Sequence, residues 1–461
     1  MKKVILVLCL MIVMGSLFPA GFQARAEDAE TTRIEYPSSM NPVGSGARAL
    51  SMGGAFISIA DDATAASWNP AGLVQLEWPE LSWVFESGHR EENTHFGKKS
   101  HLNASNTTNL SNLNYLSMVF PINEFKIDPQ YQTHKLPQMV VSFNYQHLYD
   151  FNREWDSLDY KQTGDLYAFG IAFATQVYKY LRLGVTINYW GDVFHENKWE
   201  QTYDQHMVSI FPPPPIPGGQ TIIDNTFQHD TYTIEDGWNA NIGFLYDFGK
   251  FRLGGVYKFG FKAEIDHRIY TKYSTEYPDE PDKSSDPDPT VTHSKDHLYM
   301  PMSFGLGLTY FFSQDFKIAG DFYTTKWNDF EYQHDDGRVT SPLSGKDIHL
   351  SDIGSTTWFR IGGEYRMTDH NRPKTNFFAI RGGMFYDPSP ADGSPDDIYG
   401  LTTGFGYGRE IKQYHVEKII IDTAYQYRWG NNVGESMLPN YQFDQDIREH
   451  KVYVSMIVHF L

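Results

Sequence analysis

Residues 44–73 read GSGARALSMGGAFISIADDATAASWNPAGL, and they form the least ordinary stretch of this 461-residue chain. The stretch holds five glycines, a pair of adjacent acids, Asp61 and Asp62, and a run of small residues. Glycine tolerates positive φ and close backbone approach, so Gly53 and Gly54 can adopt a positive φ or let another backbone segment approach closely. A peptide this rich in small side chains can fold compactly and pack inside something larger.

A short helix is expected in the second half of this stretch. Asp61 or Asp62 can cap a helix over residues 63–67, because an aspartate side chain accepts hydrogen bonds from the first free N–H groups of a helix. The triplet Asn69-Pro70-Ala71 follows, and its proline disfavours helical geometry at the residue before it. The helix should therefore end at the triplet.

The chain begins with the pattern of a secretory leader. Lys2 and Lys3 precede an apolar run over residues 4–14, and Ala24-Arg25-Ala26 offers small residues at the cleavage position. We therefore expect a signal peptide over 1–26.

Composition narrows the class of protein. Cys9 is the single cysteine and lies in the leader, so the mature chain would have no disulfide. Losing the three cations of the leader would take the formal net charge of −19 to about −22, which argues against a nucleic-acid partner. No other segment is apolar for long enough to form a spanning helix. Aromatic residues make up 16% of the chain, as suits many short strands with aromatic girdles.

Beyond residue 79, apolar side chains alternate with small or polar ones, the period of a β-strand. The segment 253–266 is the clearest, with Phe259 and Ile265 expected on one face and Lys258 on the other. Fourteen segments fit this pattern, namely 80–87, 112–122, 138–149, 165–177, 181–192, 236–246, 253–266, 299–312, 316–327, 357–367, 376–387, 399–410, 414–429 and 451–461.

The connections between these segments alternate between short and long, with one exception at residues 123–137. Short turns on one side and long loops on the other are typical of outer-membrane barrels. We therefore predict an all-β fold, a 14-stranded antiparallel transmembrane β-barrel over 79–461 that crosses the bacterial outer membrane many times. Fourteen strands enclose more space than side chains fill, so residues 27–78 are expected to lie inside the lumen as a plug.

Three strings in the opening stretch carry a resemblance to a known family. The Gly-Gly-Ala-Phe turn at 53–56, the Ala-Asp-Asp-Ala segment at 60–63 and the triplet Asn69-Pro70-Ala71 resemble the N-terminal hatch of the FadL/TodX family. That family consists of outer-membrane channels for long-chain fatty acids and hydrocarbons. The resemblance implies passive uptake of hydrophobic compounds, gated by the hatch, with no cofactor and no energy source. Its partners would be the solute and outer-membrane lipid.

The resemblance also implies site residues. Asn69, Pro70 and Ala71 would gate the path, while Gly53, Gly54, Asp61 and Asp62 would shape the hatch. Long extracellular loops form an apolar groove in that family, and the loop expected over 195–231 offers Ile210, Phe211 and Ile216 for ligand binding. Packing of these three residues against neighbouring loops is an equally good interpretation.

Two details of this interpretation have alternatives. Asp61 and Asp62 could bind inward basic residues such as Arg182 or Arg252, although capping is the interpretation we favour. The third strand of the family has a kink that opens the barrel wall, and residues 138–149 contain no glycine or proline to mark one.

Enzymatic motifs are missing from the sequence, which contains no HExxH, GxSxG or P-loop pattern. The glycine-rich string at 404–408 lies in an expected strand, where small inward side chains explain it. The 17 histidines are scattered without metal-ligand spacing. We predict that the protein is not an enzyme and holds no metal.

Two other classes remain open. The strings Gly-Ala-Arg-Ala, Gly-Gly-Ala-Phe and Trp-Asn-Pro-Ala-Gly-Leu are also similar to those of PorV-type barrels, which serve protein secretion and surface attachment. Such a role would imply a protein partner. A secreted soluble β-protein shares much of the composition.

Overall fold

A computed structural model describes residues 44–122, 138–155, 159–211, 220–368, 376–413, 415–435 and 442–460. The expected leader and the first part of the expected plug lie outside these residues. Within the described part of the chain, no helix is long and apolar enough to cross a membrane.

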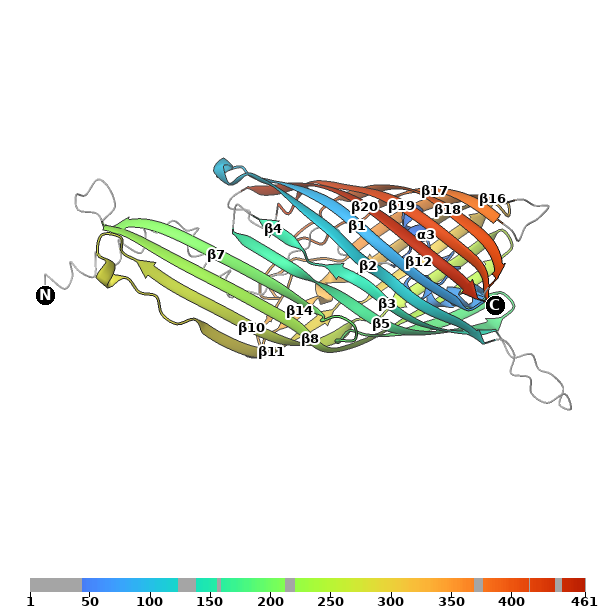
Figure 1. Ribbon diagram of the computed structural model, residues 1–461, viewed down its shortest axis with the longest axis horizontal. Helices are drawn as coiled ribbons and strands as arrows, with labels where there is room; N and C mark the ends of the chain where they lie inside the picture. The colour runs from blue at the N-terminus through green and yellow to red at the C-terminus, as the bar shows by residue number, and fades with distance from the viewer. Residues whose placement is uncertain are drawn as a thin grey trace.

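A closed ring of fourteen antiparallel strands forms the body of the molecule, as expected from the sequence (Figure 1). Each strand pairs with the next along the chain, and β1 (Glu80–Phe96) closes the ring against β20 (Phe443–Phe460). The other twelve are β2 (Ala104–Ile122), β3 (Met139–Asp150), β5 (Tyr160–Tyr178), β6 (Leu181–Tyr189), β8 (Gln220–Phe248), β9 (Phe251–Lys258), β12 (Ser303–Phe311), β13 (Phe316–Thr325), β16 (Thr356–Thr368), β17 (Asn376–Tyr386), β18 (Ile398–Gln413) and β19 (Val416–Val433). Closure leaves this ring without a free strand edge. A free edge would be costly in a membrane, because lipid cannot hydrogen-bond its backbone N–H and C=O groups.

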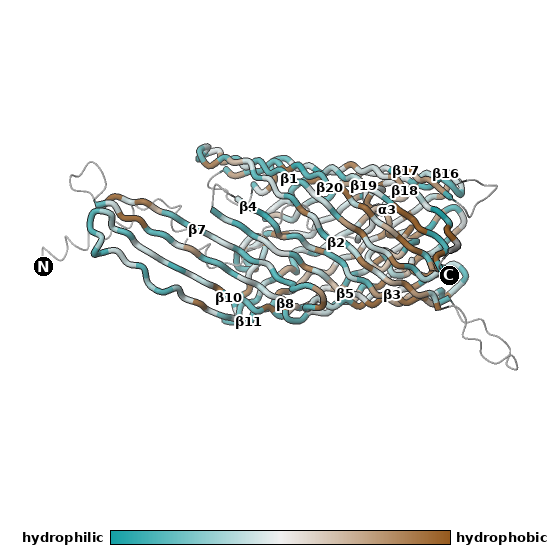
Figure 2. The backbone as a smooth tube through the Cα atoms, in the orientation of Figure 1, coloured by the Kyte–Doolittle hydropathy of each residue, from teal (hydrophilic) through white to brown (hydrophobic). Residues whose placement is uncertain are grey.

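The two faces of the wall differ as a membrane barrel requires. On β17, Phe378, Ile380 and Met384 are exposed on the outer face, whereas Ala379 and Arg381 are buried in the lumen. Hydrophobic residues gather around the half of the barrel that contains α3 and the C-terminus (Figure 2). An outward apolar band around a polar lumen places this wall in an outer membrane, which it crosses many times.

An arm of strands continues one side of the barrel beyond the ring (Figure 1). The arm consists of β7 (Lys198–Phe211), the first half of β8, β10 (Phe261–Glu276) and β11 (Thr290–Met300), hydrogen-bonded in the order β7–β8–β10–β11. It lies on the side of the long connections, which faces outward in outer-membrane barrels. Short strands β4 (Arg153–Trp155), β14 (Glu331–Gln333) and β15 (Val339–Thr340) and the single-turn helices η2 (Ser100–Leu102), η4 (Pro281–Lys283) and η5 (Trp327–Asp329) complete this side.

The arm corrects the prediction of loops over 195–231 and 274–297. The described part of the first segment is mostly strand, whereas the second is strand only at 274–276 and 290–297. Polar residues such as Thr, Asn and Gln pair across the outer part of the arm and present no apolar face that sequence periodicity would detect.

Two of the expected strands are each divided into two shorter strands in the structure. The segment 253–266 divides into β9 and β10 at Phe259-Gly260, and 299–312 divides into β11 and β12 at Pro301-Met302, where proline has no N–H for the ladder. The break also reverses the side that is buried, so Phe259 is exposed and Ile265 is not.

Residues 44–76, called the luminal segment below, fill the ring. Short helices α3 (Ala47–Ser51), α4 (Ala65–Trp68) and η1 (Pro70–Gln75) are joined by turns, and almost every side chain is buried. Gly53 and Gly54 adopt positive φ angles of 68° and 74°, which is one of the two roles expected of these glycines. The helix expected at 63–67 begins two residues later, at Ala65.

Candidate functional site

Glycines of the wall let the luminal segment approach the barrel backbone directly. A Cβ atom at Gly362 would lie 2.0 Å from the carbonyl oxygen of Met52, and one at Gly254 would lie 2.5 Å from that of Ile57. A methyl group fits at neither position. These inward glycines therefore shape the wall to the segment.

Asn69 ties the luminal segment to both itself and the wall. Its side-chain Nδ2 donates to the carbonyl oxygens of Ile57 and of Phe244 on β8, each at 2.9 Å, and its Oδ1 accepts from the N–H of Ala71. The backbone of Pro70 faces Gly184 on β6, where a Cβ would lie 2.3 Å from its carbonyl carbon. The triplet predicted to gate the path thus lies at the contact between segment and wall.

The acidic pair has a different partner from those expected. Arg48, within the same segment, contacts Asp61 at 2.6 Å and Asp62 at 3.3 Å. The favoured prediction that Asp61 or Asp62 caps the helix was wrong, because the N-cap of α4 is Thr64 and no side chain caps the helix. Asp62 instead accepts from the N–H and hydroxyl of Thr64.

The basic residues suggested for this pair, Arg182 and Arg252, contact Asp247 instead. They were therefore wrong as partners, because Asp247 on β8 lies between them, with Arg182 on the paired strand β6 and Arg252 on the paired strand β9.

Glu364 on β16 is the centre of a buried charge cluster between segment and wall. Arg48 donates to its two oxygens at 2.8 and 3.2 Å, Arg381 donates at 2.7 Å, and Lys317 lies 3.0 Å away. On the adjacent strand β13, the carboxylate of Asp321 accepts the N–H groups of Phe56 and Ile57 at 2.6 and 2.8 Å. These contacts hold the segment against this part of the wall at two points.

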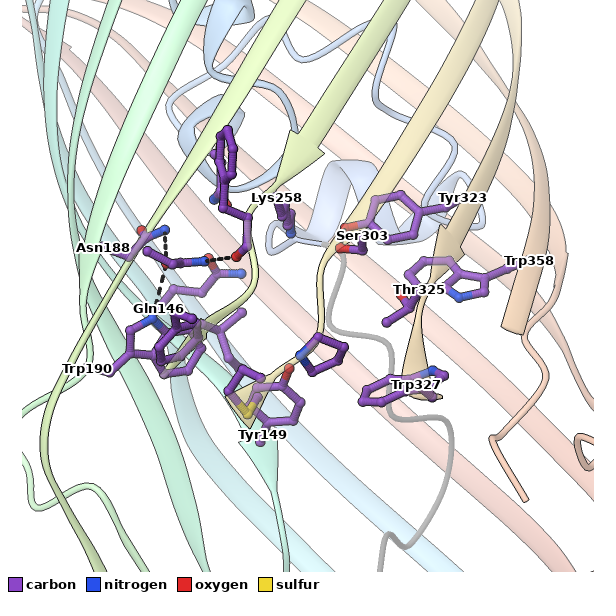
Figure 3. Close-up of a pocket in the computed structure, with 17 residues that line it drawn as sticks. Gln146, Tyr149, Asn188, Trp190, Lys258, Ser303, Tyr323, Thr325, Trp327 and Trp358 are labelled. Carbon is purple, nitrogen blue, oxygen red and sulfur yellow. Dashed lines mark hydrogen bonds between the residues drawn. The ribbon is translucent and has the colours of Figure 1, made fainter. Parts of the chain in front are cut away.

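A cavity of about 60 Å³ lies directly on the outer side of the segment (Figure 3). Its floor is made by Tyr323 and Trp358, whose rings stack 4.5 Å apart and belong to the same hydrophobic core as Phe56 and Ile57. Polar side chains in the lining are Gln146, Asn188, Asn239, Asn241, Lys258, Ser303 and Thr325. Aromatic side chains are Tyr149, Trp190, Phe259, Phe261, Tyr323, Trp327 and Trp358.

The other predicted ligand-binding residues lie elsewhere. Ile210 is half-exposed on β7 in the arm, Phe211 ends the same strand, and Ile216 lies outside the described residues. Ile210 is not among the residues that line the cavity. Sequence reasoning missed Lys258 and Trp358 as site residues, although Lys258 was expected on the luminal face of its strand.

The third strand carries an irregularity that its composition did not signal. The register between β3 and β5 shifts between His147 and Tyr149, which is a β-bulge. Neither glycine nor proline is needed for such a bulge, so the missing signal did not exclude it. The bulge borders the cavity at Tyr149.

The base of the arm is held by a buried carboxylate. Asp296 on β11 accepts hydrogen bonds from Tyr332 at 2.6 Å and from His267 at 3.2 Å, and from the N–H of Asp335 at 2.9 Å. Burial by itself would raise the pKa of Asp296, but the hydrogen bonds from His267 and Tyr332 outweigh it and lower the pKa to about 2.

A closed barrel with an apolar outer band and a segment bound within its lumen defines the class: this is an outer-membrane β-barrel protein. The chain belongs to the BamG family, because the model of that family, described as BamG, matches residues 43–408. No match is found among curated proteins.

Solved structures with the same fold are hydrocarbon channels and their relatives. A Pseudomonas aeruginosa FadL homologue is similar with a TM-score of 0.60 and 14% identity, covering 92% of this chain and 99% of that one. The CymD monoaromatic hydrocarbon channel gives 0.57 and 15%, covering 92% and 99%. The Pseudomonas putida toluene transporter TodX gives 0.54 and 15%, covering 93% and 100%. The resemblance to the FadL/TodX family therefore holds for the fold, while the family itself is BamG.

Proposed function

We propose that this protein is an outer-membrane channel for the passive passage of hydrophobic compounds, of which long-chain fatty acids and hydrocarbons are the leading candidates. The observation that carries the proposal is the cavity, lined by aromatic rings and amides, that lies on the luminal segment inside a closed barrel. The hydrocarbon transport named for CymD and TodX supports the same substrate class.

In this proposal residues 27–78 act as a hatch. The cavity of about 60 Å³ holds only a few water-sized groups and lies against the luminal segment, so in this proposal a long chain passes only when the segment moves. Asn69, Pro70 and Ala71 lie at the contact that must open. When the segment moves, its hydrogen bonds to the wall break and a continuous path opens. No catalytic residue or cofactor takes part.

Capture would begin on the outer side, where Ile210, Phe211 and Ile216 are our candidates for first contact with the solute. The half-exposed apolar side chain of Ile210 on the arm supports this role.

Uptake of labelled oleate tests the proposal. Cells that lack their own fatty-acid channel should take up oleate above the empty-vector control when this protein is folded in the outer membrane. Heat-modifiable gel mobility reports that folding. Uptake equal to the control by cells with folded protein would contradict the proposal for this substrate, and labelled toluene and an alkane would then test the hydrocarbons.

The free edge of the arm favours a second candidate, a PorV-like role in protein secretion or surface attachment. Within the described residues, 205–211 of β7 pair with β8 on one side only. An unpaired edge can accept a strand from another protein. A partner that crosslinks to position 206 in cells, and is lost when Val208 is replaced by proline, would support this candidate.

A further inference from the structure

A second cavity, of about 180 Å³, lies between the luminal segment and the wall on the side of the short turns. Its wall residues lie near strand ends on this side, among them Glu80 at the start of β1 and His459 near the end of β20. Short turns face the periplasm in outer-membrane barrels. The side chains of two lining residues, Arg366 and Asp61, are 36% and 27% exposed, so the cavity is open to water from the periplasm.

Charged side chains of both signs line this cavity in equal number. Arg48, Asp61 and Asp62 come from the luminal segment, and the described wall residues add three cations and two anions. Four cations thus face four anions, and the formal charge of the lining is zero when His459 is neutral. An uncompensated charge is costly in a buried site. A ligand with one charge of each sign therefore fits this lining better than a simple anion or cation does.

Two buried side chains of the lining each have a polar atom without a hydrogen-bond partner in the described structure. Arg381 on β17 and Asp422 on β19 form an ion pair of 2.7 Å between Nη1 and Oδ1, and both side chains are 0% exposed. Their other atoms, Nη2 and Oδ2, have no partner. A buried donor or acceptor without a partner costs free energy, and an atom of a ligand can supply that partner.

Two further cations of the lining lie against one aromatic ring. The centre of the Phe377 ring is 4.4 Å from the guanidinium carbon of Arg366 and 4.7 Å from the ammonium of Lys418. Within the described chain, the nearest carboxylate oxygen to either cation is that of Glu364, 4.0 Å from Arg366. The acidic group of a ligand can therefore form the close charge-assisted contact that these two cations lack.

We propose that this cavity binds a small zwitterion, a molecule that carries one ammonium group and one acidic group. The acidic group lies at Arg366 and Lys418, and the ammonium donates to Oδ2 of Asp422. About 180 Å³ holds roughly six to eight non-hydrogen atoms, since a cavity of about 150 Å³ holds benzene. Free amino acids and the ethanolamine phosphate head group of a phospholipid share this chemistry.

A bound zwitterion would also act on the hatch. Because Arg48, Asp61 and Asp62 belong to the luminal segment, the site is complete only while the segment is in place. A ligand that binds only this state stabilises it by mass action. A periplasmic zwitterion should therefore hold the hatch closed. The site does not depend on which solute passes through the barrel, so failure of the oleate test would leave it standing.

Calorimetric titration of the full chain in phosphatidylglycerol nanodiscs, a lipid without an ammonium group, tests the site. The probes are L-alanine, a zwitterion, propionate, which has only the acidic group, ethylamine, which has only the ammonium, and glycerol, which has neither. Alanine should bind at least about tenfold more tightly than the other three, because each of them lacks a charge-assisted hydrogen bond. Equally tight binding of any of the three would overturn the proposal.

Glycerophosphoethanolamine, a second zwitterion, distinguishes the two sources of the ligand. Tighter binding of this probe than of alanine would support the proposal with a lipid head group as the ligand, and the reverse would support it with a free amino acid. Binding of neither zwitterion by folded protein would overturn the site.

Variants of Lys418 test where the acidic group lies. Lys418→Met should weaken binding of alanine by about tenfold, and Lys418→Arg should retain it. Lys250→Met, at an exposed short turn between β8 and β9 and outside the cavity, is the matched control and should bind as the wild type does. Binding unchanged by Lys418→Met, in protein that keeps its heat-modifiable mobility, would overturn the assignment.

Amide hydrogen exchange of residues 47–62 tests the effect on the hatch. With alanine at about a hundred times its Kd, exchange of these amides should slow by about a hundredfold in the wild type. Exchange that stays unchanged at this concentration would overturn the claim that the ligand holds the hatch closed.

Discussion

Replacing Arg48 by methionine should release the luminal segment from the wall. Arg48 is the one residue of the segment's described part that contacts Glu364, and it also contacts Asp61 and Asp62. The side chains of Arg48 and Glu364 are 8% and 2% exposed, so the pair is buried and poorly screened by water. The change leaves three carboxylates in the cluster without this cation.

The size of the effect follows from the contacts that remain. Breaking a buried ion pair by removing one partner costs about 3–5 kcal/mol. Glu364 keeps Lys317 and Arg381 as neighbours, so the loss should fall near the lower end, about 3 kcal/mol. A loss of this size raises the fraction of detached segment by roughly two orders of magnitude.

Amide hydrogen exchange of peptides covering residues 47–62 measures this fraction in the folded barrel. Exchange in the Arg48→Met variant should be about a hundredfold faster at these amides and unchanged in β17–β19. The double variant with Glu364→Gln should recover part of the protection, because it removes one uncompensated anion. An increase below about fivefold would refute the claim that this cluster holds the segment.

Three further predictions concern other contacts. Asn69→Ala removes three side-chain hydrogen bonds, about 3 kcal/mol in total, and should speed solute uptake while the barrel keeps its heat-modifiable mobility; unchanged uptake would show that Asn69 does not restrain the hatch. Gly362→Ala places a methyl group against the Met52 carbonyl and should expose residues 47–56 to exchange, whereas Gly363→Ala, whose Cβ would have no atom nearer than 3.5 Å, should not. Asp296→Asn should weaken the base of the arm. At a pH above about 4, the ordinary pKa of an aspartate, the low pKa of Asp296 contributes about 2 kcal/mol to the stability of the arm, and this contribution is lost as the pH falls toward 2. Hydrogen exchange in β11 should therefore rise in the variant at neutral pH, and in the wild type only in acid.

The barrel was predictable because each of its fourteen strands must present an apolar face to lipid, and this requirement imprints period two on the sequence. The arm carries no such requirement. Over residues 202–210 of β7 every side chain is at least partly exposed, so this segment resembles a loop in composition while pairing as a strand.

The candidate site was predictable only in part. Asn69 stood out through its motif, and it does lie at the contact between segment and wall. The pairing of Arg48 with Glu364 joins residues 316 positions apart and leaves no local pattern. Lys258 was expected on the luminal face of its strand. Its place in the lining of the cavity depends on the break after β9, and the sequence Phe259-Gly260 did not reveal that break.

A reversible lock on the hatch tests the central claim most directly. The hydroxyl oxygens of Ser58 in the luminal segment and Thr309 on β12 lie 2.7 Å apart, so cysteines at these two positions can form a disulfide between hatch and wall. Oleate uptake by the oxidised Ser58→Cys, Thr309→Cys protein should fall to the empty-vector level and return on reduction, if solutes pass only when the hatch moves. Uptake that is the same in the oxidised and reduced protein would contradict the account.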